Sequence, residues 1–92
     1  MAQVIITFKI MPENPDVDLE KVHVEALKKI AGFAGEGETK KDIEPVAFGL
    51  NALKIIFVSD ETKGGTEELE KDIETIEGVN SVEVIDVRRA LG

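Results

Sequence analysis

The stretch that decides the fold runs Glu44-Pro-Val-Ala-Phe-Gly-Leu-Asn-Ala-Leu-Lys-Ile-Ile-Phe-Val-Ser59. Its second half, residues 52–59, is almost continuously apolar, and apolar side chains on both faces of a strand are typical of the centre of a sheet. Its first half belongs to a weaker strand, predicted over residues 40–48, in which Pro45 favours an edge position because proline cannot donate to a ladder. Gly49 separates the two halves, so the stretch predicts a hairpin with Phe48 at its turn.

N-terminal to this hairpin, the sequence predicts one strand and one helix. Residues 4–11 are rich in β-branched and aromatic side chains with a period of two, which predicts a strand that ends at Pro12. Asp16 and Asp18 then offer capping oxygens to a helix of about 15 residues. The apolar residues of this helix recur at spacings of three and four, as on one buried face: Leu19, Val22, Ala26, Leu27 and Ile30.

C-terminal to the hairpin, the sequence predicts a second helix followed by a last strand. Thr66 can cap a second helix, and Gly78 stands where a left-handed residue ends a helix. The apolar stripe of this helix comprises Leu69, Ile73 and Ile76, and a last strand follows from Val79. The order β-α-β-β-α-β places both helices on one face of a four-stranded antiparallel sheet. The predicted fold class is therefore α+β, a ferredoxin-like sandwich, in a single domain over residues 1–92.

Composition excludes several classes of function. The chain has no cysteine, which excludes disulfides, thiolate metal sites and thiol nucleophiles. The net charge of −8, with acidic residues dominating from Asp60 to Asp86, opposes direct nucleic-acid binding and would attract a basic protein. No apolar run approaches the ~20 residues of a membrane span, and no leader is evident, so a cytoplasmic protein without membrane contact is expected.

No arrangement of side chains indicates an enzyme. The single histidine, His23, lies beside the apolar stripe of the first predicted helix and has no recognisable partner for acid–base chemistry. Gly64-Gly65-Thr66 precedes a helix but lacks the spacing and the lysine of a phosphate loop. Asp60 and Glu61 lack the ligand spacing of a calcium loop. We therefore expect no catalytic residue, no cofactor and no dedicated metal site.

Four blocks, in order over essentially the entire chain, resemble the elongation factor 1-beta family. They are Ile10–Leu19 with its Met-Pro and Pro-Asp-Val-Asp segments, Glu44–Leu53, Gly64–Glu67 and Gly78–Arg89. The resemblance implies the ferredoxin-like fold and a role as a guanine-nucleotide exchange factor. The implied partner is the translation GTPase elongation factor 1-alpha, whose Mg²⁺ and phosphate site the exchanger opens so that GDP leaves and GTP loads.

The resemblance also implies which residues bind the GTPase. In eukaryotic members, the Phe of a Gly-Phe-Gly turn contacts the GTPase, and this role falls on Phe48 with Gly49, although alanine replaces the first glycine here. A lysine near their C-terminus projects toward the Mg²⁺ pocket. This chain has no lysine in Ala90-Leu91-Gly92, so Arg88 or Arg89 is the candidate cation, a few residues early. The expected partner-binding residues are Phe48, Gly49, Arg88 and Arg89.

The residues alone leave other interpretations open. Phe48 can fold back onto the core, and the two arginines can simply offset the acids beside them. A different class of function is also compatible with the fold, namely an ACT-like regulator that binds a small molecule at an edge-to-edge seam. Within the family, the chain resembles the exchange module alone, without the N-terminal regions of eukaryotic members.

Overall fold

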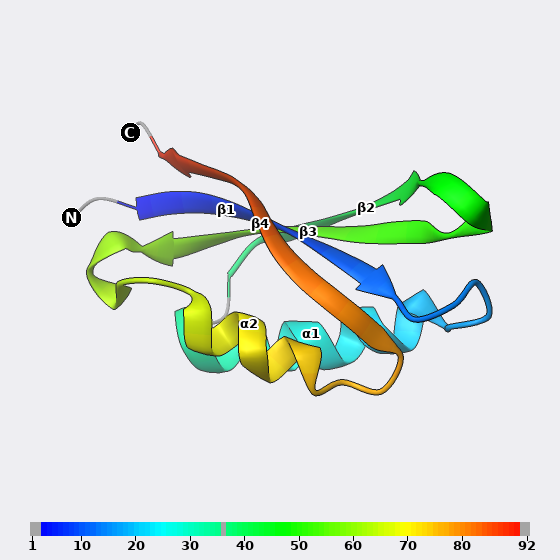
Figure 1. Ribbon diagram of the computed structural model, residues 1–92. Coiled ribbons are helices and arrows are strands. Elements are labelled where there is room, and N and C mark those ends of the chain that lie inside the picture. Colours follow the sequence, from blue (N-terminus) through cyan, green and yellow to red (C-terminus); the bar gives the residue numbers. More distant parts are fainter. Residues whose placement is uncertain (1–2, 36, 91–92) are drawn as a thin grey trace.

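Strands and helices follow one another in the predicted β-α-β-β-α-β order in the computed structural model, which describes residues 3–35 and 37–90 (Figure 1). The elements are β1 (Gln3–Pro12), α1 (Leu19–Ala34), β2 (Thr39–Pro45), β3 (Asn51–Asp60), α2 (Glu67–Glu74) and β4 (Val79–Arg89). The four strands form one antiparallel sheet in the order β2-β3-β1-β4, and both helices lie on the same face of it. The predicted ferredoxin-like α+β fold is confirmed.

The core lies between this face of the sheet and the two helices. The central strands β1 and β3 pair so that Phe8 is opposite Ile55 and Ile6 is opposite Phe57. Phe8 and Phe57 pack edge to face with ring centroids 5.1 Å apart. The helices cover these side chains with the buried residues Val22, Ala26, Ile30, Leu69 and Ile73. The prediction of a central strand over residues 52–59 is confirmed by the position of β3.

The helix ends agree only in part with the sequence-based expectations. Asp18 caps α1, since its side chain accepts the backbone N–H of Glu20 at 3.0 Å. Thr66 occupies the predicted N-cap position of α2, but its side chain does not accept a backbone N–H of the helix, and its hydroxyl donates to the Glu70 carboxylate at 2.9 Å instead. The helix ends at Glu74, so Ile76 packs against the core from the turn that follows, not from the helix itself.

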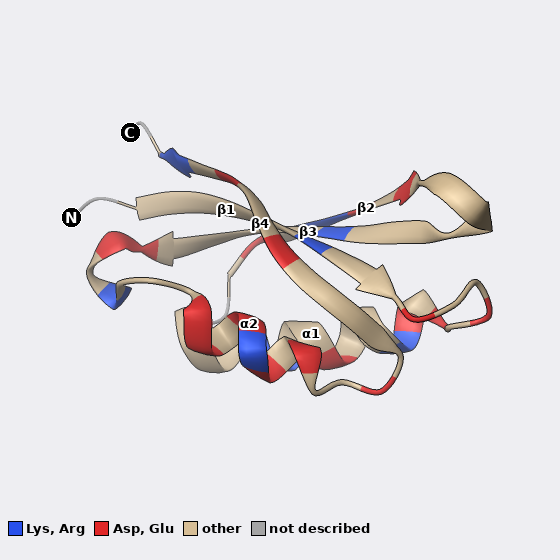
Figure 2. Ribbon diagram, in the orientation of Figure 1, with Lys and Arg blue, Asp and Glu red and all other residues tan. Residues whose placement is uncertain are grey.

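The two layers differ in charge (Figure 2). Acidic residues outnumber basic ones in α2 and in the loops, whereas α1 and the strands carry acidic and basic side chains in nearly equal measure. On the face of the sheet that no helix covers, one row across the strands contains Asp42, Lys54, Lys9 and Glu83. The excess negative charge of the chain is therefore concentrated in α2 and the loops.

The molecule is elongated, with principal extents of 42 × 21 × 19 Å. The turn between β2 and β3 lies at one end, while the start of β1, the end of β4 and the turn after β3 lie together at the other (Figure 1). In the part of the chain that the structure describes, no helix is long and apolar enough to cross a membrane.

Candidate functional site

The hairpin turn (Ala47–Gly49) forms a short 3₁₀ segment between β2 and β3. Leu50 N–H donates to Ala47 C=O at 3.3 Å, and Val46 N–H donates to Leu50 C=O at 2.8 Å. The prediction that the second strand continues to residue 48 is wrong. The ladder ends where Pro45 pairs with Asn51, because the chain beyond Pro45 closes its hydrogen bonds within the turn.

Phe48 occupies an unfavourable backbone conformation at the tip of this turn. It is the one non-glycine residue with positive φ among the described residues, at φ 63° and ψ 30°, and Gly49 follows at φ 74°. Two successive positive φ angles are typical of a type I′ hairpin turn, which favours Asn or Gly at the place Phe48 takes. The Phe48 side chain is 93% exposed, so the alternative that it folds back onto the core is wrong.

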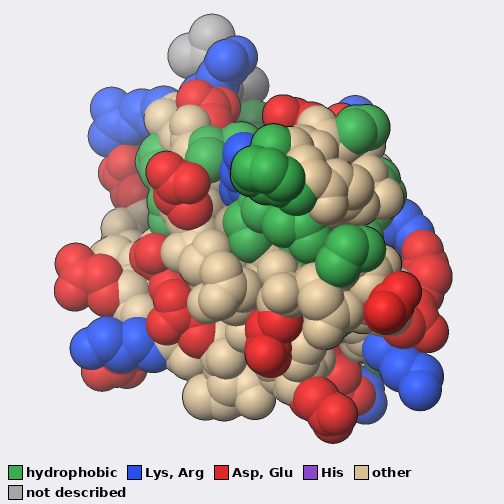
Figure 3. Space-filling view, turned by 45° about the vertical axis from the view of Figure 1, so that its right-hand side comes forward, with side chains coloured by type: hydrophobic (Ala, Val, Ile, Leu, Met, Phe, Trp, Pro, Cys, Tyr) green, Lys and Arg blue, Asp and Glu red, His purple; other side chains and the backbone are tan. Residues whose placement is uncertain are grey.

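Hydrophobic side chains gather around the hairpin turn. Figure 3 shows them grouped on the upper part of this end of the molecule, with charged side chains at the margin. Val46 and Leu50, which flank the turn, are half-buried, and Ile43 of β2 is 39% exposed. The hairpin end therefore presents an apolar surface, which is the chemistry expected of a protein-binding surface.

An ion pair between Glu44 and Lys54 fixes the base of the hairpin on the uncovered face of the sheet. The hydrogen bond from Lys54 lowers the pKa of Glu44, and the same bond raises the pKa of Lys54. Both groups are therefore charged at neutral pH. Asp42 is the residue directly opposite Lys54 in the ladder, and Glu44 reaches Lys54 diagonally from two residues further along β2.

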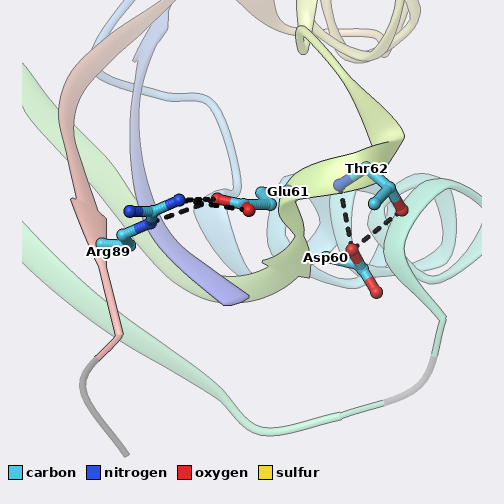
Figure 4. A network of polar contacts seen from close by, with 4 residues as sticks. All are labelled: Asp60, Glu61, Thr62 and Arg89. Atoms are coloured by element: carbon cyan, nitrogen blue, oxygen red, sulfur yellow. Dashed lines mark hydrogen bonds and ion pairs between the residues drawn. The ribbon is translucent and has the colours of Figure 1, made fainter. Parts of the chain in front are cut away.

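The two arginines lie at the other end of the molecule, and both are paired with acids. Arg88 Nε lies 2.8 Å from Asp86 Oδ2. Arg89 binds both carboxylate oxygens of Glu61 (Figure 4). Its Nη2 donates to Oε2 at 2.9 Å and to Oε1 at 3.2 Å, and its Nε donates to Oε2 at 3.2 Å. The backbone N–H of Ala90 donates to Gln3 C=O at 2.8 Å. Residues 91–92, the remainder of the C-terminal segment Ala90-Leu91-Gly92 that has no lysine, lie outside the described residues.

The predicted site residues do not form one cluster. Phe48 and Gly49 lie together in the hairpin turn, and Arg88 and Arg89 are neighbours at the end of β4. The ten residues of β3 separate the two pairs, which corresponds to roughly 30 Å at the usual rise of a strand. Sequence reasoning also missed Glu61 as the partner of Arg89, since nothing in their 28-residue separation signals a contact.

His23 takes part in neither region. It lies on α1, and its Nε2 atom is buried with no hydrogen-bond partner among the described residues. Burial lowers the pKa of His23, and the nearby Lys41 lowers it further while Glu20 opposes the shift. Across residues 3–35 and 37–90, no three His, Cys, Asp or Glu side chains are grouped closely enough to hold a metal ion.

Comparison with known proteins identifies the family. The family model for the EF-1 guanine nucleotide exchange domain matches residues 5–90. An elongation factor 1-beta from Methanothermobacter thermautotrophicus is 46% identical over 91 residues, which cover 99% of this chain and 100% of the relative. An elongation factor 1-beta from Staphylothermus marinus is 47% identical over 92 residues, which cover 97% and 98% of the two chains.

A solved structure supports the fold independently. The chain described as BlrP1 BLUF superposes with a TM-score of 0.55 at 16% identity, covering 98% of this chain and 56% of that one. At this level of identity the likeness concerns the fold alone. The sequence matches favour the exchange-factor interpretation over the ACT-like alternative. The chain therefore belongs to the elongation factor 1-beta family and carries a guanine nucleotide exchange domain of translation elongation.

Proposed function

We propose that the protein accelerates the exchange of GDP for GTP on elongation factor 1-alpha by binding near the Mg²⁺ and phosphate end of its nucleotide site. The observation that carries the proposal is Phe48, a large aromatic that is 93% exposed in a left-handed conformation. Such a conformation costs an L-residue about 1–2 kcal/mol, and the exposed ring contributes no burial within the protein that would offset this cost. A contact formed only with a partner explains why this position holds a phenylalanine.

The mechanism requires no reactive group on this chain. An exchange factor acts through a coupling free energy, so the factor by which it weakens GDP is also the factor by which GDP weakens the exchanger. Much of the GDP affinity of such GTPases comes from the backbone and Mg²⁺ around the phosphates. Binding that disturbs this region therefore releases GDP without any covalent step.

The two ends of the molecule supply two separate contacts in this proposal. The hairpin turn with Phe48 and Gly49 provides an apolar contact, and Arg88, next to the Glu61-bound Arg89, provides a cationic group at the opposite end. The sheet joins the two contacts, and its central strands set their separation. Because the sites lie far beyond the range of direct coupling, their free-energy contributions to binding are expected to add within about 0.5 kcal/mol.

The test measures the release of a fluorescent GDP analogue, mantGDP, from elongation factor 1-alpha. The unmodified chain is expected to accelerate release. Phe48→Ala is expected to reduce kcat/KM for exchange by about 10- to 100-fold, because burying a phenylalanine contributes about 1.5–3 kcal/mol. Phe48→Leu serves as the control, since it keeps an apolar side chain and should retain part of the activity.

Two results would contradict the proposal at different points. Release at the rate of buffer alone with the unmodified chain would exclude the exchange function on this partner. Unchanged release with Phe48→Ala would remove Phe48 from the mechanism and leave the function itself intact.

A further inference from the structure

The side chains of Arg88 and Arg89 emerge on opposite faces of the sheet. In the β1–β4 register, Arg88 is opposite Ile5 on the uncovered face, and Arg89 is opposite Val4, which packs against the core on the helix face. Neighbouring residues of a strand always point to opposite faces, and a bulge decides which arginine takes which face, because the register shifts between Thr7 and Phe8 and inverts the alternation along β4. One partner surface therefore cannot receive both guanidinium groups in the same way.

Arg89 is engaged within the protein. Its guanidinium group makes three hydrogen bonds to the Glu61 carboxylate, between 2.9 Å and 3.2 Å, in the fork-to-carboxylate geometry that is strongest for arginine. Figure 4 shows the two side chains pointing toward one another from the end of β4 and from the turn after β3. The contact joins two elements that are not neighbouring strands in the sheet, whose order is β2-β3-β1-β4.

The turn that carries Glu61 is itself held in shape. Asp60 Oδ1 accepts the backbone N–H of Thr62 at 2.9 Å and its hydroxyl at 2.8 Å, which caps the short 3₁₀ segment Glu61–Lys63 (Figure 4). These two hydrogen bonds lower the pKa of Asp60, so the cap stays ionised at neutral pH. Glu61 is therefore presented to Arg89 by a turn that does not depend on Arg89 for its shape.

The end of β4 is thus held by more than its own strand. Two contacts therefore hold this end: the backbone N–H of Ala90 donates to Gln3 C=O of β1 at 2.8 Å, and Arg89 reaches across β1 to Glu61 in the turn after β3. Arg88 immediately precedes these two anchors. Its side chain is 76% exposed, and Asp86, two residues away on the same strand, is its only ion-pair partner among the described residues. The two arginines differ little in exposure, since Arg89 is 69% exposed, but Arg89 is bound to another element of the protein and Arg88 only to its own strand. Arg88 is consequently the guanidinium group that can turn toward a partner without releasing a contact between elements.

We propose that Arg89 is a positioning residue for nucleotide exchange: it binds Glu61, holds the end of β4 in place and so directs Arg88 toward the GTPase. This inference rests on the proposed function. It differs from a direct role of Arg89 in one measurable respect. A direct contact needs a cation at residue 89, whereas a tether needs only opposite charges at residues 61 and 89.

The test is a charge exchange between the two residues, assayed by mantGDP release from elongation factor 1-alpha. Arg89→Glu and Glu61→Arg, each alone, place like charges together and are expected to lower kcat/KM at least about threefold. The double variant restores opposite charges at unchanged net charge and is expected to return to within about twofold of the unmodified chain. Glu68→Arg on α2 is the matched control, since it changes the net charge as Glu61→Arg does but lies away from the tether.

A second readout follows the tether itself. Hydrogen exchange at the Ala90 amide is expected to speed up in each single variant and to slow again in the double variant, while the thermal midpoint stays within about 2 °C throughout. A double variant that remains as inactive as Arg89→Glu would overturn the positioning role and favour direct contact. Unchanged Ala90 protection in the single variants would also overturn it. If the unmodified chain itself fails to accelerate release, the proposed function and this inference fall together, which separates that outcome from the other two.

Discussion

Replacing Phe48 by asparagine is expected to stabilise the protein while removing its contact with the partner. The hairpin turn has positive φ at both Phe48 and Gly49. Asparagine tolerates the left-handed conformation because its short polar side chain bonds locally, and asparagine before glycine is the preferred pair in a two-residue turn of this kind. Asparagine therefore suits the backbone conformation of this turn better than Phe48 does.

The size of the effect follows from exposure and backbone strain. The Phe48 side chain is 93% exposed, so its removal forfeits almost no burial within the protein. Relief of a left-handed conformation that costs about 1–2 kcal/mol should return about 0.5–1 kcal/mol, since asparagine retains part of the cost. For a domain of this size, that gain corresponds to a rise in thermal midpoint of about 2–8 °C.

Thermal and urea unfolding measure the gain, and mantGDP release measures the accompanying loss of exchange. Phe48→Ala is the control for side-chain removal without relief of the backbone, and its stability should stay within about 0.5 kcal/mol of the unmodified chain. A fall in stability of more than about 0.5 kcal/mol for Phe48→Asn would show that the ring packs against the protein in solution. Phe48 would then stabilise the protein itself and would not serve a partner alone.

Gly78→Ala is expected to lower the free energy of unfolding by about 2–4 kcal/mol, because its φ is +94° and an added Cβ would lie 2.8 Å from Val17 Cγ1. Urea unfolding measures this, and a loss below about 1 kcal/mol would contradict the close approach. His23 has a lowered pKa, so the unfolded chain binds protons more readily and stability should fall as the pH drops through about 6.5. His23→Gln should flatten that part of a plot of thermal midpoint against pH, and an unaltered plot would assign the slope to other groups. Arg88→Ala should weaken association with elongation factor 1-alpha and reduce its dependence on salt, whereas Lys71→Ala on α2, with the same change of charge, should leave the salt dependence nearly unchanged.

The sequence was sufficient to predict the order of elements and most of the core. Period-two alternation in residues 4–11, the apolar run in residues 52–59 and the Asp18 cap each depend on near neighbours, and each is confirmed. The positive φ of Gly78 was likewise predictable from local sequence, but its predicted place was wrong, because α2 ends at Glu74 with Thr75 as its C-cap and Gly78 lies in the turn before β4.

The directions of the arginines could not be predicted, because they depend on a bulge. Alternation from Val82 and Val84, which face the core, would place Arg88 on the helix face. The shift in the β1–β4 register places Arg88 on the uncovered face instead. The ion pair between Arg89 and Glu61 could not be predicted either, because the two residues come together only once the strands have assembled into the sheet.

The unequal charge of the two layers makes the molecule an electric dipole as well as an anion. A strongly charged neighbour therefore exerts a torque in addition to a net attraction or repulsion. Near a polyanion such as RNA, the torque turns the helices outward and the nearly neutral sheet inward. At physiological salt the effect is confined to about 8 Å from that surface, so it selects an orientation only in the last step of approach.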